Sequence, residues 1–303
     1  MTPEKSNSRK HFEEPQRFLY MIDETIEEIQ EMQTHSSSVV AVKATQSLTE
    51  LLDREYATLD EFERDLERNL GALRRANTSH ASLFNAMRAI RVNVVDRSTT
   101  VADAKELLSE VITRIVEDVQ HGKSRAAEKA VSTFTDGECI LTHDFSSTVL
   151  ATIRQAVNRD ISITAYVTEA RPRYLGRKTA RRLAKIEDVE PSLLVDGAVG
   201  EVLPRCDRVV LGMDCIVDNK LYNRIGTLPI VATANALDVP VTVIGAASKI
   251  VESEFMFENE YRSSAEVSLE PLEDIRIENP AYDSTAIHLV DQIITDNGIE
   301  KVD

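Results

Sequence analysis

After Asp136-Gly137, short runs of β-forming residues alternate with helical segments to the end of the chain. The runs cover residues 138–142, 161–168, 193–196, 208–214 and 239–244, and helical patterns fill 148–158, 177–185, 223–237 and 284–297. Strands separated by helices in this way are typical of βαβ crossovers, which build a mostly parallel sheet with helices on both faces. We therefore expect an α/β fold, Rossmann-like in shape, in this half of the chain.

The residues before this half carry helical patterns only. Apolar residues recur at three- and four-residue steps in 15–33 and again in 39–52, which indicates amphipathic helices. In the first of these segments they are Phe18, Leu19, Ile22, Ile26 and Ile29. The serine cluster at 36–38 offers an N-cap to the second segment.

Three further helices are predicted in the same region. Thr58-Leu59-Asp60-Glu61 forms a capping box, and the helix that it opens is expected to end near Gly71. A shorter helix covers 82–91. A long one runs from about residue 101 to His121-Gly122, because a glycine is a common helix stop.

The change of pattern divides the chain into two expected domains. Residues 1–128 should form a helical N-terminal domain, and 129–303 a Rossmann-like domain for ligand binding and dimerisation. A chain of 303 residues is long enough for two such units. The boundary falls between Gly122 and Asp136, since a helix there could pack on either domain.

The charge of the chain limits its partners. Its 35 Lys and Arg residues face 51 Asp and Glu residues, a net charge of −16. This excess argues against broad binding to nucleic acid or to an anionic membrane. A strongly acidic surface with few lysines is typical of a cytoplasmic protein from a high-salt organism. The polar N-terminus and the absence of a long apolar run predict neither a secretory peptide nor a membrane-spanning helix.

The sequence offers no support for a metal or a nucleotide cofactor. The three cysteines and six histidines are scattered, without CxxC or HExxH spacing, so we expect free thiols and no metal site. Gly176-Arg177-Lys178-Thr179 resembles the end of a P-loop, but Arg171 stands where its first glycine belongs. The first strand is followed by no GxGxxG, so the fold does not imply NAD.

Polar residues follow the strands of the predicted sheet. In open parallel sheets, ligands bind outside the carboxyl ends of the strands. The segments at those ends are 142–147, 168–172, 212–214 and 245–249. They bring an arginine, a lysine, carboxylates and a hydroxyl-rich helix start to one edge, which suits a phosphorylated small molecule.

These segments resemble a known family, the translation initiation factor 2B alpha, beta and delta subunits with the related methylthioribose-1-phosphate and ribose-1,5-bisphosphate isomerases. The resemblance runs from about Leu83 to the end, and the helical domain is similar in pattern. The motifs that carry it are Ile140-Leu141-Thr142-His143, Thr168-Glu169-x-Arg171-Pro172 with Gly176, Gly212-Met213-Asp214, Asn223-Arg224-Ile225-Gly226-Thr227, Pro240, Lys249 and the segment 279–285.

The resemblance implies a general acid/base pair. In the isomerases, a cysteine after Thr-His works with the aspartate of Gly-x-Asp to move protons between neighbouring carbons of the open-chain sugar. Asp214 is present here, but Asp144 occupies the cysteine position. Cys139 lies roughly 16 Å away along the strand and cannot replace that cysteine. Two acids at one edge raise one another's pKa, so Asp144 argues against ordinary isomerase chemistry and leaves a variant open.

Phosphate binding is altered as well. Ser38-Val39 and Asn77-Thr78-Ser79 stand where the isomerases carry phosphate-binding arginines. The resemblance leaves Arg171, Arg224, Lys249 and the amides near Ser146 to hold a phosphate. His143, Asn223 and Thr227 complete the expected ligand-binding set.

Each of these residues also has a structural alternative. His143 could close the strand end through backbone hydrogen bonds, and Asp144 could be the N-cap of the next helix. Asp214 could belong to a structural ion pair. The segment 223–227 could simply begin a helix, and Arg171 and Lys249 could be solvated surface charges.

Three hypotheses about function follow. The leading one is an initiation factor 2B alpha-like protein that binds a sugar phosphate or nucleotide as a regulatory ligand, without efficient catalysis. It would form a homodimer or larger oligomer and could contact initiation factor 2 or related subunits. The alternative is an aldose–ketose isomerase for ribose-1,5-bisphosphate or methylthioribose-1-phosphate, with Asp214 as the main acid/base group. The third is a purely structural subunit.

Overall fold

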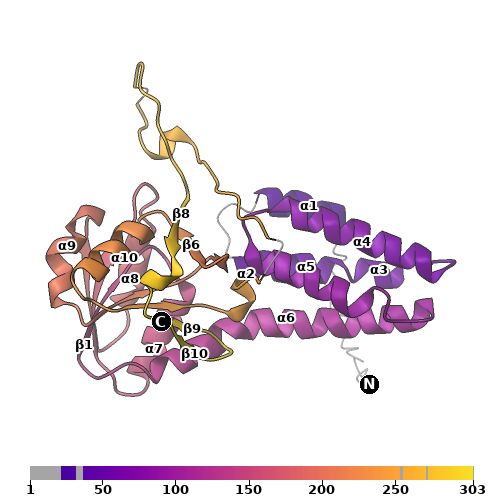
Figure 1. Cartoon of the computed structure of the whole chain (residues 1–303), viewed down its shortest axis with the longest axis horizontal. Helices are drawn as coiled ribbons and strands as arrows, with labels where there is room; N and C mark the ends of the chain where they lie inside the picture. Colours follow the sequence, from indigo (N-terminus) through magenta and orange to yellow (C-terminus); the bar gives the residue numbers. More distant parts are fainter. Residues whose placement is uncertain (1–21, 32–36, 253–254, 271, 303) are drawn as a thin grey trace, which may run out of the picture.

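The computed structural model describes residues 22–31, 37–252, 255–270 and 272–302. An elongated helical part lies beside an α/β part, and helix α6 extends from one into the other (Figure 1). This arrangement confirms the expected helical N-terminal region followed by a mostly parallel α/β region.

The helical part contains six α-helices in the described residues. They are α1 (Ile22–Glu31), α2 (Ser37–Ser47), α3 (Glu50–Asp53), α4 (Leu59–Ala76), α5 (Ala81–Val94) and α6 (Val101–Val131). Their apolar stripes meet in one core that includes Ile22, Ile29 and Phe62. Phe18, Leu19 and Ser36, which the sequence assigned to a helix or its cap, lie outside the described residues.

The capping box at the start of α4 is confirmed. Thr58 Oγ1 accepts a hydrogen bond from the Glu61 amide at 3.2 Å, and the Glu61 carboxylate accepts one from the Ala57 amide at 2.9 Å. The predicted end near Gly71 is wrong, because the helix continues to Ala76. Buried Leu70 and Leu73 carry its apolar stripe past the glycine, and this packing outweighs the weak helix propensity of one residue.

The predicted end of the long helix at His121-Gly122 is also wrong. Helix α6 has 31 residues and continues to Val131. A Cβ on Gly122 would lie 3.2 Å from Ala246 Cβ and 3.3 Å from Asp296 Oδ2, so the glycine permits close packing against the sheet edge. The helix crosses the proposed domain boundary at 128/129, and that boundary stays a prediction.

The main sheet has seven strands in the order β10-β9-β7-β4-β1-β2-β3. All neighbours pair in parallel except β10 with β9. The strands are β1 (Glu138–Thr142), β2 (Ile163–Thr168), β3 (Val189–Leu194), β4 (Arg208–Leu211), β7 (Val241–Ile244), β9 (Gln292–Ile294) and β10 (Ile299–Lys301). The chain moves outward from β1 in one direction and from β4 in the other, so a ligand is expected at the carboxyl ends of these two neighbours.

Helices cover both faces of the sheet. Helices α9 (Val199–Val202) and α10 (Thr227–Ala236) pack on one face, in a cluster with Leu141 and Val209. Helices α7 (Ser147–Val157) and α8 (Leu175–Leu183) and the end of α6 contribute to a second cluster, with Ile140 and Val210. Neighbouring strand residues therefore point to opposite faces, and both faces are apolar because both are covered.

Two predicted helices are corrected. The segment 284–297 is not helical: it holds the end of β8 (Tyr282–Ala286), a short 3-10 turn and β9. The segment 223–237 is helical only from Thr227, since residues 223–224 end strand β6 (Lys220–Arg224). Strands β5 (Cys215–Val217), β6 and β8 form a second, antiparallel sheet. The backbone N–H and C=O groups of these residues pair between strands, so they are not available for the hydrogen bonds of a helix.

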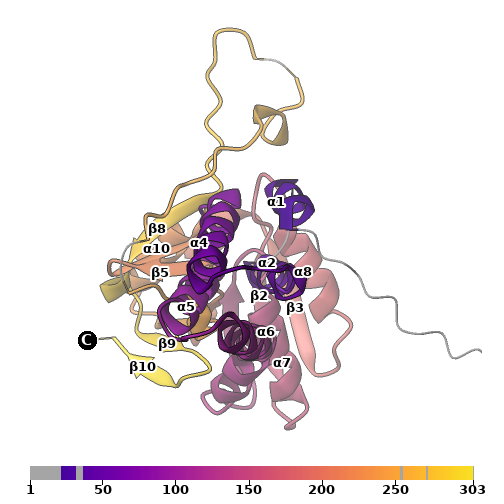
Figure 2. The ribbon, with the colours of Figure 1, turned by 90° about the vertical axis from the view of Figure 1, so that its right-hand side faces the viewer.

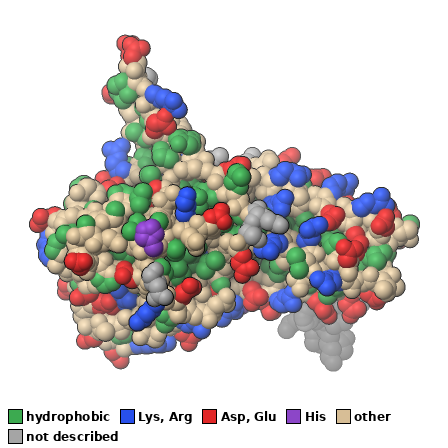
Figure 3. Space-filling model, viewed as in Figure 1, with side chains coloured by type: hydrophobic (Ala, Val, Ile, Leu, Met, Phe, Trp, Pro, Cys, Tyr) green, Lys and Arg blue, Asp and Glu red, His purple; other side chains and the backbone are tan. Residues whose placement is uncertain are grey.

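An arm stands out from the α/β part between β7 and β8 (Figures 1 and 2). We define it as the described residues of 255–281. Its two limbs pair at the base, where the Arg262 amide donates to the Asn279 carbonyl at 2.9 Å and the Ala281 amide to the Glu260 carbonyl at 2.8 Å. Apolar side chains along it are exposed, among them Leu269 at 90% and Ile275 at 60%, and green patches mark such residues on the arm in Figure 3.

Two sequence expectations concern the cysteines and the membrane. Cys139, Cys206 and Cys215 are free thiols, as expected. Burial raises the pKa of Cys206 and of Cys215 to about 12, so neither is a ready nucleophile. In the described part of the chain, no helix combines the length and the apolar character needed to cross a membrane.

Candidate active site at the carboxyl edge of the sheet

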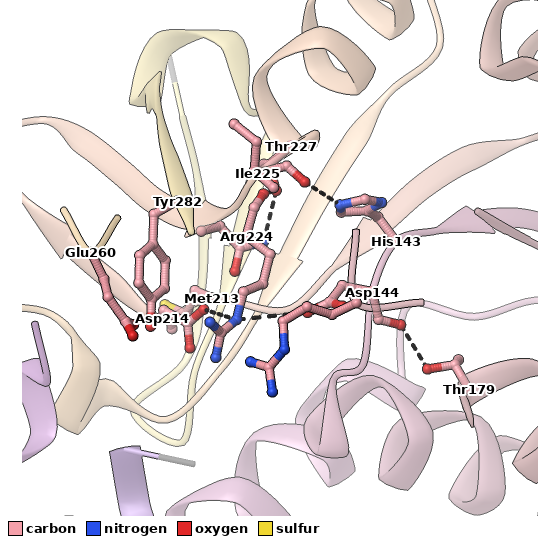
Figure 4. Close-up of polar contacts among 12 residues, drawn as sticks. His143, Asp144, Thr179, Met213, Asp214, Arg224, Ile225, Thr227, Glu260 and Tyr282 are labelled. Carbon is pink, nitrogen blue, oxygen red and sulfur yellow. Dashed lines mark hydrogen bonds and ion pairs between the residues drawn. The ribbon is translucent and has the colours of Figure 1, made fainter. Parts of the chain in front are cut away.

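Asp144 and Asp214 follow the neighbouring strands β1 and β4, at the point where the strand order reverses. The Nε atom of Arg224 lies 3.7 Å from Asp144 Oδ2 and 3.4 Å from Asp214 Oδ2, so one guanidinium joins both carboxylates (Figure 4). The guanidinium also lies 4.7 Å from the centre of the Tyr282 ring. Strand β6 thus delivers a cation to the edge that the main sheet supplies with two acids.

Asp144 is a buried acid in an unusual backbone conformation. Its φ of 57° is left-handed, a region that aspartate tolerates better than most residues. Burial raises the pKa of its carboxyl, against the opposing effect of Arg224, and Asp214 adds a smaller upward effect. The N-cap of α7 is Ser146, whose Oγ accepts from the Val149 amide at 3.2 Å. The Asp144 side chain is therefore left to the site and does not cap the helix.

His143 uses both ring nitrogens within the protein. Its Nε2 lies 2.8 Å from the Ile225 carbonyl oxygen, which can only accept, so Nε2 carries the proton. Its Nδ1 then accepts from the Thr168 hydroxyl at 2.6 Å. A Cβ on Gly226, whose φ is 105°, would lie 2.8 Å from the imidazole. The histidine holds the turn before α10 in place. This role is close to the structural alternative, in which His143 bonds to the backbone at the strand end.

Asn223 and Thr227 are also bonded locally. Asn223 Nδ2 donates to Thr227 Oγ1 at 3.1 Å, and the Thr227 hydroxyl donates to the Arg224 carbonyl at 2.8 Å. Asp283, which the sequence analysis did not select, accepts from the Gly226 amide at 2.8 Å and from the Leu228 amide at 3.1 Å. These bonds fix the strand-to-helix turn that orients Arg224.

The two remaining predicted cations differ in their surroundings. Lys249 is partly buried, and its Nζ donates to the Met213 carbonyl at 2.7 Å, so it lies beside Asp214. Burial lowers the pKa of its ammonium group, and the charge of Asp214 opposes this effect. Arg171 is exposed and donates to the Val267 carbonyl of the arm at 3.1 Å. Lys249 is thus within the site, and Arg171 is at its outer rim.

A small pocket of about 30 Å³ opens beside Asp144 and contains residues that the sequence analysis missed. Arginines surround it, and the base of the arm forms one wall. Its polar lining consists of Asp144, Arg171, Arg173, Arg224, Arg262, Glu266 and Asn279. Arg173 could have been suspected from the Arg171-Pro172-Arg173 turn, but only the fold brings Arg262 to the same place.

The helical part places a buried histidine, His80, at the start of the helix that docks on residues 248–250. It is 8% exposed and directly precedes α5. Burial lowers the pKa of its imidazole to about 4, and the charges of Asp214, Arg224 and Lys249 also act on it. His80 does not follow a strand, so the expectation that ligand-binding residues follow the strands does not select it. Among the described residues, no group of three or more metal-ligating side chains is present.

Comparisons with known proteins find relatives over most of the chain. The chain is 32% identical over 294 residues to ribose 1,5-bisphosphate isomerase of Haloterrigena turkmenica, covering 90% of this chain and 88% of that protein. It is 27% identical over 289 residues to translation initiation factor eIF2B subunit alpha of Caenorhabditis elegans, covering 89% and 92%.

The fold also matches a solved structure. The crystal structure of the Pyrococcus horikoshii OT3 translation initiation factor eIF-2B superposes with a TM-score of 0.74 at 24% identity, covering 94% of this chain and 97% of that chain. The model of the initiation factor 2 subunit family matches residues 33–301. The chain therefore belongs to the initiation factor 2 subunit family.

Proposed function

We propose that this protein is an aldose–ketose isomerase for a ribose phosphate, the alternative considered from the sequence. One observation carries the proposal: Arg224 and Asp144 line a pocket rich in arginines, and Arg224 also pairs with Asp214. The 32% identity to a ribose 1,5-bisphosphate isomerase supports it. Between ribose-1,5-bisphosphate and methylthioribose-1-phosphate, this identity favours the first.

The pocket suits a phosphate group. Arginine presents a planar fork of donors that matches phosphate oxygens. Arg173 is held only loosely, since its Nε lies 3.8 Å from Glu266, and Arg262 lies in the same wall. Burial and the neighbouring Arg262 lower the pKa of Arg173, so an anionic ligand would relieve the repulsion between these cations. Arg171 at the rim would meet the ligand first.

The two carboxyl groups suit proton transfer between carbons. Asp144, whose pKa burial raises, favours the protonated form and can donate a proton. Asp214, paired with Arg224 and partly exposed, is the group to remove a proton from carbon. A proton leaves one carbon of the open-chain sugar and a proton is returned to its neighbour, so no oxidant, reductant or metal is consumed. Environments that separate two acids into donor and acceptor are a common design for such chemistry.

A second candidate is a regulatory sugar-phosphate or nucleotide site without efficient turnover. The observation that favours it is Asp144 itself, which stands where the related isomerases carry a cysteine. In this case a bound ligand would act on the arm, whose base lines the pocket. The arm would then pass the effect to any subunit bound to it. Contact with initiation factor 2 belongs to this candidate.

One experiment separates the two candidates. Purified protein in molar KCl is incubated with ribose-1,5-bisphosphate or methylthioribose-1-phosphate, and ketose formation is followed by NMR. We expect turnover that Asp214→Asn abolishes, while Asp218→Asn in the nearby β5–β6 turn leaves it unchanged. Calorimetry on the same samples measures binding. Tight binding without turnover would reject the isomerase and support the regulatory site.

We infer also that two copies of the chain associate. The arm exposes Leu269 and Ile275 to solvent, and large apolar side chains on an extended segment favour burial against a partner. A second copy is the simplest occupant, because a twofold contact is the commonest closed assembly. Such a contact would hold the base of the arm, and with it one wall of the pocket.

A further inference from the structure

Cys139 and Cys206 form a pair of free thiols at the amino end of the main sheet. Cys139 is the second residue of β1, and Cys206 lies two residues before β4, the neighbour of β1 in the sheet. Both side chains belong to the apolar cluster on the face that α9 and α10 cover. The pair therefore lies at the end of β1 and β4 opposite to Asp144 and Asp214, away from the site described above.

The backbone places the two cysteines at a distance that a disulfide can span. The Asp207 amide donates to the Cys139 carbonyl at 2.8 Å, and Ile140 pairs with Arg208 in the parallel ladder. Cys206 has an extended backbone and precedes Asp207, so it is one residue out of register with Cys139. Paired strands lie about 4.8 Å apart and rise about 3.3 Å per residue, which gives a Cα separation of about 6 Å. Disulfides span about 4.4–6.8 Å between Cα atoms.

The side chains of the pair also approach each other. The Cys139 thiol lies within hydrogen-bonding reach of the Cys206 thiol. The Cys206 Sγ donates to the Val202 carbonyl at 3.6 Å, on the α9 side of the sheet. Cys215 is buried in a separate cluster with Phe84. Of the three cysteines of the chain, Cys139 and Cys206 are therefore the two that a disulfide can join.

Cys139 is the accessible member of the pair. It is partly exposed, whereas Cys206 is buried. Tyr166 and Leu194 in the same cluster are also only partly buried, so a small molecule can approach this part of the face. Burial raises the pKa of the Cys139 thiol, and the contact with Cys206 opposes this effect. Because the thiolate is the nucleophile, Cys139 should react slowly at pH 7 and faster as pH rises.

We propose that Cys139 and Cys206 are a reversible oxidation site, which a low-molecular-weight disulfide converts to an intramolecular disulfide. The Cys139 thiolate attacks one sulfur of the small disulfide, forms a mixed disulfide and releases one small thiol. Cys206 then loses its proton and its sulfur attacks the Cys139 sulfur, which releases the second small thiol. The small disulfide gains the two electrons and two protons that the cysteines lose, and excess small thiol reverses the reaction. This inference does not depend on the isomerase function.

The bond would have a measurable effect on stability. It would close a loop over residues 140–205, which include β2, β3, α7 and α8. A disulfide across a loop of this length stabilises a protein mainly by restricting the unfolded chain. We expect the melting temperature of the oxidised protein to exceed that of the reduced protein by roughly 5 °C or more. A lower melting temperature after oxidation would mean that the bond forms only in a distorted fold, and would overturn the proposal.

The main test treats the reduced, native protein in molar KCl with oxidised glutathione at pH 7 and at pH 9. Remaining thiols are blocked with N-ethylmaleimide under denaturing conditions, and the products are mapped by mass spectrometry after trypsin. The three cysteines fall in separate tryptic peptides, 130–154, 206–208 and 209–220. We expect the first two peptides to be joined, faster at pH 9, with Cys215 recovered as a blocked thiol. Glutathione that stays on Cys139, or a Cys139 that is still a free thiol at pH 9, overturns the proposal.

Two variants separate the roles of the thiols. Cys206→Ser should stop at the mixed disulfide on Cys139, because the resolving thiol is absent. Cys215→Ser is the matched control and should form the bond at the wild-type rate. A Cys206→Ser protein that takes up no glutathione at pH 9 would show that Cys139 is not the attacking thiol, and would overturn the proposal. The mapping of the wild-type protein needs no substitution, so it decides the matter even if Cys206→Ser fails to fold.

Discussion

The Nε atom of Arg224 lies 3.4 Å from the carboxylate of Asp214. Strand β6 carries the arginine and the end of β4 carries the acid, so this ion pair joins the small antiparallel sheet to the main parallel one. The same guanidinium reaches Asp144 after β1. The charge balance of the site therefore depends on Arg224. Substitutions of Arg224 and of the acids beside it should change activity and stability in defined directions.

Asp144→Cys should increase isomerase activity. The thiol would take the position that the cysteine of related isomerases holds, and a thiol near Arg224 can reach the thiolate form more readily than an isolated one. We expect at least a tenfold rise in kcat, measured by NMR, with an unchanged circular dichroism spectrum. Asp144→Ser is the matched control, similar in size but without a titratable thiol. Equal activities in the two variants would mean that the pocket, and not the acid/base group, limits the rate.

Arg224→Met should destabilise the protein in a pH-dependent way. The pKa of Asp144 is already raised in the folded state, so this residue favours folding when protonated, and that contribution is lost as pH rises. Removing Arg224 takes away the main opposing effect and raises the pKa further. We expect a loss of about 3 kcal/mol at pH 8 and a clearly smaller loss at pH 4.5, measured by urea unfolding.

The control for this experiment is Arg276→Met. Arg276 pairs with Glu278 on the arm, but its side chain is 88% exposed. Exposed pairs contribute about 0–1 kcal/mol, so little change is expected at either pH. A loss for Arg224→Met that is the same at pH 4.5 and pH 8 would contradict the role assigned to Asp144.

Salt should stabilise the folded chain. With a net charge of −16, repulsion among surface carboxylates grows when the Debye length increases from about 3 Å at 1 M to about 10 Å at 0.1 M salt. We expect the melting temperature to fall by several degrees between 1 M and 0.1 M KCl. A melting temperature that stays constant over this range would remove the inference of a high-salt origin.

Inorganic phosphate should restore part of the stability lost at low salt, because it binds only the folded state. Combined substitution of Arg171→Ala and Lys249→Ala should remove this rescue. The rescue is measured as the shift in melting temperature on adding phosphate at roughly 10 mM. Potassium sulfate at matched ionic strength separates specific binding from screening. An equal rescue in the double variant would exclude both residues from the phosphate site.

The arm should be required for association. Leu269→Asp with Ile275→Asp places two charges on its exposed apolar residues, which are 90% and 60% exposed. Light scattering in molar KCl at micromolar concentration should give a dimer or larger for wild type and a monomer for this variant. Val92→Asp, at a 50% exposed position of α5, is the control and should not change the mass. A wild-type monomer across the whole range would reject the dimer.

The sequence by itself determined the order of helices and strands wherever a local pattern agreed with its surroundings. Strand β1 occupies the predicted residues, and the capping box at Thr58 begins α4 as expected. Both depend on neighbouring residues only: a short run of β-forming residues for the strand, and two side chains that accept hydrogen bonds from nearby backbone amides at the start of the helix. The position of Asp144 and Asp214 at the sheet edge also followed, since parallel strands bring their carboxyl ends together.

Only the tertiary structure decided the features that depend on distant partners. Gly122 lies inside a helix, where its missing side chain leaves room for Ala246 and Asp296, and residues 282–286 are a strand because β6 lies beside them. Arg224, expected to bind phosphate, lies between two acids, and Asn85 of the helical part bonds to residues 248 and 250 on either side of Lys249. A local pattern records what a residue prefers, but burial and charge pairing depend on what the fold places next to it.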